Sequence, residues 1–211
     1  MEEMKMKKML VLVTVMALSL VSMAQAADLQ GDFSLDQNPN GDWTYGSIDV
    51  TAGTFTTYNG VNSGMSGAST FSAWVTDSNW DSYGNVGKNF GPDPIEDWSS
   101  YREVGQIIYG PAVWTNGSGV YYLTTSRWTA PAAGSYDIDA TFTGQWPSGS
   151  SVTASVRLNG TEIFSGAIDG FIGKAAEGFS DRWGDHPSQN YIGTLSLNAN
   201  DTLDFCVQFL T

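Results

Sequence analysis

The sequence has only one cysteine and one histidine among its 211 residues. A lone cysteine, Cys206, forms no internal disulfide, so burial of apolar side chains must stabilise the fold. Zinc sites and nucleophile–histidine pairs need these residues in clusters, whereas His186 lies between Asp185 and Pro187 in a predicted loop. No Gly-x-Ser-x-Gly motif or Gly-rich phosphate loop occurs. These absences argue against nucleophilic hydrolase, nucleotide-binding and transition-metal functions.

Basic residues are also scarce, with 9 Lys and Arg against 22 Asp and Glu. Three of the basic and two of the acidic residues lie before residue 27, which leaves 6 and 20 and a net charge of −14 for residues 27–211. The basic residues form no cluster in the sequence, so neither nucleic acid nor anionic lipid is expected as a partner. The acidic excess favours solubility and leaves carboxylates for a hard cation such as Ca²⁺.

Long hydrophobic runs are limited to one, Met9–Val21, which follows three lysines. It is shorter than the ~20 residues of a membrane-spanning helix and ends in Ser-Met-Ala-Gln-Ala, a small-residue cleavage site. We therefore expect residues 1–26 to be a signal peptide, with no membrane span after cleavage. The predicted location is secreted, either extracellular or periplasmic, and residues 27–211 are expected to form a single domain.

What the chain does contain is a clear strand pattern. From Tyr136 to Phe142 every second residue is apolar, the period of a half-buried strand. The same alternation runs over 152–158 and ends at Asn159-Gly160, which favours a type I′ hairpin turn. A two-residue turn predicts the pairs Leu158–Thr161, Arg157–Glu162 and Val156–Ile163, with Val156 and Ile163 facing the core.

Other segments complete an all-β prediction. We expect a strand pair within 44–58, a strand at 71–76, and two pairs of neighbouring strands at 104–114 with 119–128 and at 193–198 with 202–209. Segments 77–102 and 169–191 are predicted to be irregular. The predicted fold is an antiparallel β-sandwich of jelly-roll type with long aromatic-rich loops.

Four motifs carry a family resemblance: "NPNGDWTYG", "WTAPAAGSYDIDATFTG", "VTASVRLNGTEIFSG" and "NANDTLDFCV". Together they resemble a family of uncharacterised secreted bacterial β-sandwich proteins, many of which end in a PEP-CTERM sorting tail, and the domain is similar in outline to carbohydrate-binding jelly rolls. The resemblance covers about residues 37–207. This sequence departs from the pattern at Asn200, where Gly is usual, and in lacking the sorting tail.

In the resembled family a further segment follows the strand at 202–209 and closes the sheet. We therefore expect a C-terminally truncated domain in which 202–209 is an edge strand with unpaired backbone groups. Such an edge recruits another chain, and Cys206, on the side of the strand that faces away from the core, would be partly accessible. The resulting expectation is a dimer through the C-terminal edge, joined by a Cys206 disulfide.

Aromatic residues in polar loops supply the strongest functional indication. Sugar rings stack on aromatic faces while Asp and Asn receive their hydroxyls. The predicted ligand-binding residues are Trp80, Trp98, Trp146, Trp183, Tyr101 and Asp181. The alternative for each tryptophan is to anchor a long loop to the end of the sandwich.

Carboxylates give a weaker indication. Asp137 and Asp139 lie two apart on one strand face and are the predicted metal ligands, with Ca²⁺ as the cofactor they would suit. The alternative is a solvated strand face, because no D-x-D-x-D-G loop is present. Loop carboxylates are numerous enough to form a glycosidase pair, but no motif singles one out.

Three hypotheses for function follow, in this order. The first is a non-catalytic extracellular module that binds polysaccharide or another glycan through loop aromatics. The second is a structural or matrix protein that assembles with another extracellular protein through the edge of its sandwich. The third is a glycoside-cleaving enzyme.

Overall fold

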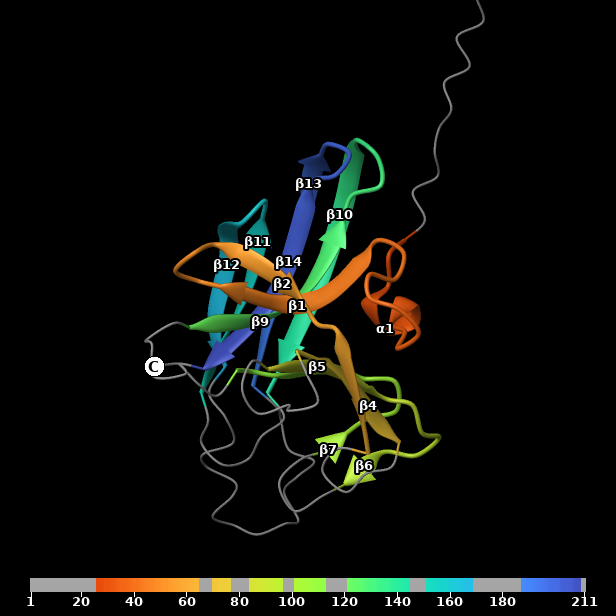
Figure 1. The fold of residues 1–211 in the computed structure, drawn as a ribbon. Coiled ribbons are helices and arrows are strands. Elements are labelled where there is room, and N and C mark those ends of the chain that lie inside the picture. Colours follow the sequence, from red (N-terminus) through yellow and green to blue (C-terminus); the bar gives the residue numbers. More distant parts are fainter. Residues whose placement is uncertain are drawn as a thin grey trace, which may run out of the picture.

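The computed structural model describes residues 26–64, 70–76, 84–96, 101–112, 121–144, 151–168 and 187–209. Apart from one short helix, α1 (Leu29–Asp32), the described elements are strands (Figure 1). They are β1 (Trp43–Asp49), β2 (Thr54–Thr57), β3 (Gly60–Ser63), β4 (Phe71–Val75), β5 (Asn85–Asn89), β6 (Ile95–Glu96), β7 (Tyr101–Arg102), β8 (Ile107–Gly110), β9 (Tyr122–Thr129), β10 (Gly134–Thr143), β11 (Val152–Leu158), β12 (Thr161–Ile168), β13 (Ser188–Leu197) and β14 (Thr202–Phe209).

The largest sheet is antiparallel and has six strands in the order β12-β11-β14-β9-β1-β2. A second sheet has the order β3-β4-β5-β8, β10 pairs with β13 as a ribbon of ten residue pairs, and β6 pairs with β7. In Figure 1 the β10–β13 ribbon reaches the top of the view, β1 and β9 cross the middle, and β4 and β5 lie below them.

One core joins the six-stranded sheet to the other two larger sheets. It contains Trp128 and Leu203 of the six-stranded sheet, Trp74 of the four-stranded sheet, and Phe142 and Leu197 of the ribbon. The antiparallel sheets therefore pack against each other, and the prediction of an all-β sandwich is confirmed. No helix in the described ranges is long and apolar enough to cross a bilayer.

The strand pattern of β10 is as predicted. Along β10, Tyr136, Ile138 and Ala140 are half-buried and Phe142 is buried, whereas the residues between them are exposed. The strands predicted within 44–58 and at 71–76 are β1, β2 and β4.

The hairpin prediction is correct at the turn and wrong beyond it. Asn159 and Gly160 have φ angles of 50° and 80°, as a type I′ turn requires, and Leu158 and Arg157 pair with Thr161 and Glu162. The register then shifts between Val156 and Arg157.

Because of this bulge, Val156 pairs with Phe164, and Ile163 is 37% exposed. The predicted Val156–Ile163 pair is therefore wrong. The extra residue allows the larger Phe164 ring to turn inward, where it packs 5.6 Å from the Tyr191 ring.

Two predicted strand pairs are also wrong, because these neighbours in sequence belong to different sheets. β8 pairs with β5, whereas β9 pairs with β1 and β14. β13 pairs with β10, whereas β14 pairs with β11 and β9. Chain reversals usually join hydrogen-bonded neighbours, but in a sandwich they also cross from one layer to the other.

The segments predicted to be irregular contain strands. β5 lies inside the four-stranded sheet although its sequence, Asn-Val-Gly-Lys-Asn, has little apolar character. Gly87 allows this strand to pack closely against the Phe71 ring, because a Cβ at Gly87 would lie only 2.5 Å from Cζ of the ring and would clash with it. β6, β7 and the start of β13 are further corrections of the same kind.

The C-terminal strand β14 is not an edge strand. It is hydrogen-bonded to β11 on one side and to β9 on the other, and Cys206 is a free thiol with no exposed area. The predictions of unpaired backbone groups and an accessible Cys206 are therefore wrong. The predicted dimer depended on β14 being an edge strand, which it is not. The inward direction of Leu203 and Val207 is confirmed.

Candidate functional site

Most of the predicted ligand-binding residues lie outside the described part of the chain. This applies to Trp80, Trp98, Trp146, Trp183 and Asp181. Tyr101 is placed only as a position in β7, opposite Glu96. These residues therefore stay predictions, and a candidate site has to be sought among the described residues.

The predicted metal ligands, Asp137 and Asp139, lie on the outer face of β10 and are exposed. The Thr194 hydroxyl donates a 2.6 Å hydrogen bond to Oδ1 of Asp137, and the exposed Ile192 lies opposite Asp139. Within the described ranges no group of three or more acidic, His or Cys side chains is arranged to hold a metal ion. The calcium site stays a prediction.

A row of charged side chains crosses the outer face of the six-stranded sheet. The strand register places Arg127, Asp204, Arg157 and Glu162 side by side on β9, β14, β11 and β12. Charges of opposite sign therefore alternate along the row. The Arg157–Glu162 pair was predicted from the hairpin and is confirmed, with 3.5 Å between Nη1 and Oε2.

On the two central strands of the sheet, Arg127 and Asp204 form a two-point ion pair. Nε donates to Oδ1 at 2.6 Å and Nη2 donates to Oδ2 at 2.8 Å. The Asp204 side chain has no exposed area, whereas the Arg127 side chain is 24% exposed. A buried carboxylate needs such a partner, because an unpaired charge away from water is costly.

An aromatic ring from β2 fixes the Arg127 guanidinium from another direction. Cζ of Arg127 lies 4.0 Å from the centre of the Phe55 ring, close enough for a cation–π interaction. Phe55 reaches across β1 because Gly46 lies between them, where a Cβ would come within 2.7 Å of the ring. Glycine at this position therefore permits the contact between Phe55 and Arg127.

Beside the charged row runs a row of small side chains. The register aligns Gly46, Thr125, Cys206 and Ser155 across four strands, and all four are buried although they are on the outer face. Burial raises the pKa of the Cys206 thiol to about 12, despite a hydrogen bond from Thr125 that acts in the opposite direction. Ile48, Leu123 and Phe55 pack on the thiol as a second apolar cluster.

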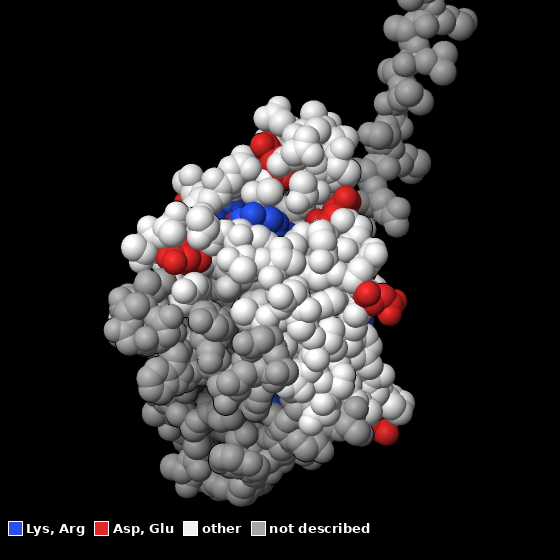
Figure 2. Space-filling view, viewed as in Figure 1, with Lys and Arg blue, Asp and Glu red and all other residues white. Residues whose placement is uncertain are grey.

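The charged row keeps hydrogen-bonding groups for a ligand. Arg157 and Glu162 are 24% and 47% exposed, and Nη1 of Arg127 has no partner among the described residues. Figure 2 shows one prominent group of basic atoms on the face in view, with acidic atoms close to it. The other described basic residues lie elsewhere: Nζ of Lys88 binds the Gln30 carbonyl, and Arg102 is buried over the Phe71 ring.

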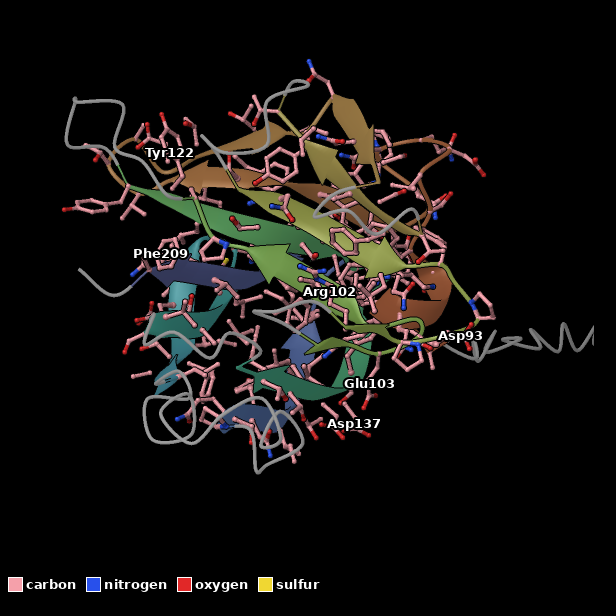
Figure 3. All side chains as sticks on the ribbon, turned by 90° about the horizontal axis from the view of Figure 1, so that it is seen from below. Asp93, Arg102, Glu103, Tyr122, Asp137 and Phe209 are labelled. Carbon is pink, nitrogen blue, oxygen red and sulfur yellow. The ribbon has the colours of Figure 1, made fainter. Side chains whose placement is uncertain are left out.

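The ribbon and the charged row belong to different sheets. Figure 3 shows Asp137 of the ribbon far from Tyr122 at the start of β9. Among the described residues, the charged row combines an aromatic ring with fixed donors and an exposed acceptor. It is therefore the candidate site of the described structure.

Comparison with protein-family models, with curated proteins and with solved structures finds no match to this chain.

Proposed function

We propose that the protein is a non-catalytic extracellular binding module that holds a glycan on the outer face of its six-stranded sheet. The observation that carries the proposal is the row of Arg127, Asp204, Arg157 and Glu162 with Phe55 beside it. The predicted signal peptide and the resemblance to carbohydrate-binding jelly rolls support the same class of function.

The chemistry of the row suits sugars. A sugar hydroxyl both donates and accepts hydrogen bonds, so a binding surface needs groups of both kinds. Arg127 and Arg157 donate only, and Glu162 accepts only. Neighbouring strands are about 4.8 Å apart, so the four strands of the row extend over about 14 Å and offer contacts to an extended chain.

Loop aromatics would extend this surface. Trp80, Trp98, Trp146, Trp183 and Tyr101 are the residues we expect to stack on sugar rings, with Asp181 as a hydrogen-bond acceptor. Their contribution is separable from that of the row by mutation.

The proposal is tested by affinity electrophoresis in gels that contain soluble polysaccharides. We expect at least one polysaccharide to retard the wild-type protein, and Glu162→Gln and Phe55→Ala to reduce the retardation. The control is Asp137→Asn with Asp139→Asn, which changes exposed carboxylates on the ribbon and should leave binding unchanged. Trp98→Ala and Trp183→Ala measure how much the loop tryptophans contribute to polysaccharide binding.

Three results would contradict the proposal in different ways. Retardation lost only in the tryptophan variants would move the site from the sheet to the loops. Loss in the ribbon control alone would move it to the Asp137 face. An unretarded protein that self-associates in light scattering would favour the rival hypothesis of a structural protein.

A further inference from the structure

We propose that the glycan is anionic, and that its carboxylate or sulfate groups bind at Arg127 and Arg157. This inference rests on the proposed function and adds the class of ligand. Its basis is the geometry of the two arginines and the distribution of charge around them.

The guanidinium of Arg127 is fixed before any ligand arrives. Asp204 binds Nε and Nη2, and the Phe55 ring lies against the guanidinium at 4.0 Å. Because these contacts already restrain the side chain, a ligand that binds the remaining Nη1 edge loses little additional conformational entropy. Arginine also recognises planar carboxylate and sulfate-like oxygens better than a point charge does.

The second arginine is anchored as well. Nε and Nη2 of Arg157 donate to the Gly160 carbonyl at 3.1 and 2.8 Å, which ties the side chain to the hairpin turn. Its nearest charge, Glu162, is 3.5 Å from Nη1 and 47% exposed, so water partly screens this attraction. Arg157 therefore keeps much of its attraction for an anion.

The distribution of charge along the row favours an anion at its Arg127 end. Arg127 and Arg157 are each 24% exposed and flank the fully buried carboxylate of Asp204, and the exposed Glu162 lies at the end of the row away from Arg127. The whole chain carries a net charge of −13, which opposes a densely charged polyanion such as nucleic acid. A glycan that carries at most one charge on each sugar is repelled less strongly by the acidic protein and can still bind the arginines.

The test uses matched polymers that differ in charge. A dextran sulfate with one sulfate on each sugar or fewer is compared with dextran, and polygalacturonate with the same polymer after reduction of its carboxyl groups. We expect retardation by one or both charged polymers, and at least about tenfold weaker binding of their neutral counterparts. Binding should also weaken as the salt concentration is raised from about 0.01 M to about 0.15 M, because the exposed charges are then screened.

Two variants test the residues. Arg157→Gln removes one positive charge from the row, and Lys88→Gln removes one from another part of the surface as its control. The double variant Arg127→Met with Asp204→Leu removes the central ion pair without changing the net charge. It leaves no unpaired buried charge, so it is expected to fold, which circular dichroism and thermal unfolding verify.

We expect roughly tenfold weaker binding of the charged polymer in the double variant, a smaller loss in Arg157→Gln, and no change in Lys88→Gln. Equal loss in Arg157→Gln and Lys88→Gln would show a general charge effect and overturn the inference. A wild-type protein that binds neutral and charged polymers equally well would overturn the inference and leave the proposed function standing. If no polymer binds, neutral or charged, both fail.

Discussion

The β10–β13 ribbon and the centre of the six-stranded sheet bury their side chains in different ways. Along β10 and β13, more exposed and more buried residues alternate over nearly the whole length of each strand. In β9, by contrast, the four consecutive residues Leu123–Ser126 are all buried, and β14 buries both Leu203 and Asp204. The ribbon is half-buried, whereas the centre of the sheet buries side chains on both faces and leaves Arg127 partly exposed on the outer one.

The difference teaches that polar residues at the centre must find partners inside the protein. Thr124 and Thr125 donate to the carbonyls of Gly110 and Leu123, and Asp204 is paired with Arg127. Some groups are less well satisfied, since among the described residues four buried polar atoms have no hydrogen bond of good geometry. They are the hydroxyls of Tyr45, Tyr109 and Ser126 and Nε1 of Trp128.

The largest expected effect tests which residue of the hairpin faces the core. Val156→Asp places a charge where the side chain has no exposed area, so we expect it to prevent folding. Ile163→Asp is expected to fold, because the bulge leaves Ile163 37% exposed. Circular dichroism and thermal unfolding compare the two, and a folded Val156→Asp variant would show that the register is wrong.

The next effect concerns the ion pair at the centre of the sheet. Arg127→Ala leaves Asp204 buried without a partner and should lower the free energy of unfolding by about 3 kcal/mol. Arg157→Ala breaks a more exposed pair and should cost less than about 1 kcal/mol. Urea denaturation measures both values, and equal costs would show that the centre is no more buried than the hairpin.

Three tyrosines predict a loss of stability at alkaline pH: Tyr45 and Tyr58 are buried, and Tyr109 is partly buried with a buried hydroxyl. Burial raises the pKa of Tyr45, Tyr58 and Tyr109 well above their ordinary value of about 10. The unfolded chain therefore releases these protons at a lower pH than the folded chain does. Their contribution is complete below about pH 10 and is lost as the pH rises, by about 1.4 kcal/mol per pH unit for each tyrosine.

Denaturation at a series of pH values, combined with tyrosinate absorbance, measures this loss. We expect these three tyrosines to ionise together with unfolding, and Tyr109→Phe to reduce the alkaline loss by about one third. Ionisation of all tyrosines in a still-folded protein would contradict the burial of the centre.

The same burial predicts an unreactive thiol. Cys206 has no exposed area, and its pKa is raised to about 12, so little thiolate forms below that pH. We expect a thiol reagent at pH 8 to label Cys206 only in denaturant. Fast labelling of the native protein, or a disulfide-linked dimer on a non-reducing gel, would restore the earlier expectation of an accessible Cys206.

The sequence predicts the strand β10 and the turn at Asn159 well, because both follow from local alternation and turn preference, but it does not predict that β10 pairs with β13. It does not reveal the bulge at Ile163 either, because a two-residue turn favours the register without a bulge and both Ile163 and Phe164 are apolar. The ion pair of Arg127 and Asp204 joins residues 77 positions apart, and each alone resembles a solvated charge on a strand. Only the order of strands brings them together, which is why this half of the candidate site could not be predicted, whereas the Arg157–Glu162 half follows from the hairpin.

The smallest expected effect tests the ribbon. Ile192 is 73% exposed on β13, so Ile192→Thr removes little buried area and keeps a β-branched side chain suited to a strand. We expect the free energy of unfolding to change by less than about 0.5 kcal/mol. Leu197→Thr is the control on the same strand: Leu197 is 3% exposed and packs in the main core, so its replacement should cost about 2 kcal/mol or more. A cost for Ile192→Thr as large as that of Leu197→Thr would mean that the outer face of the ribbon is covered, and its contrast with the centre of the sheet would disappear.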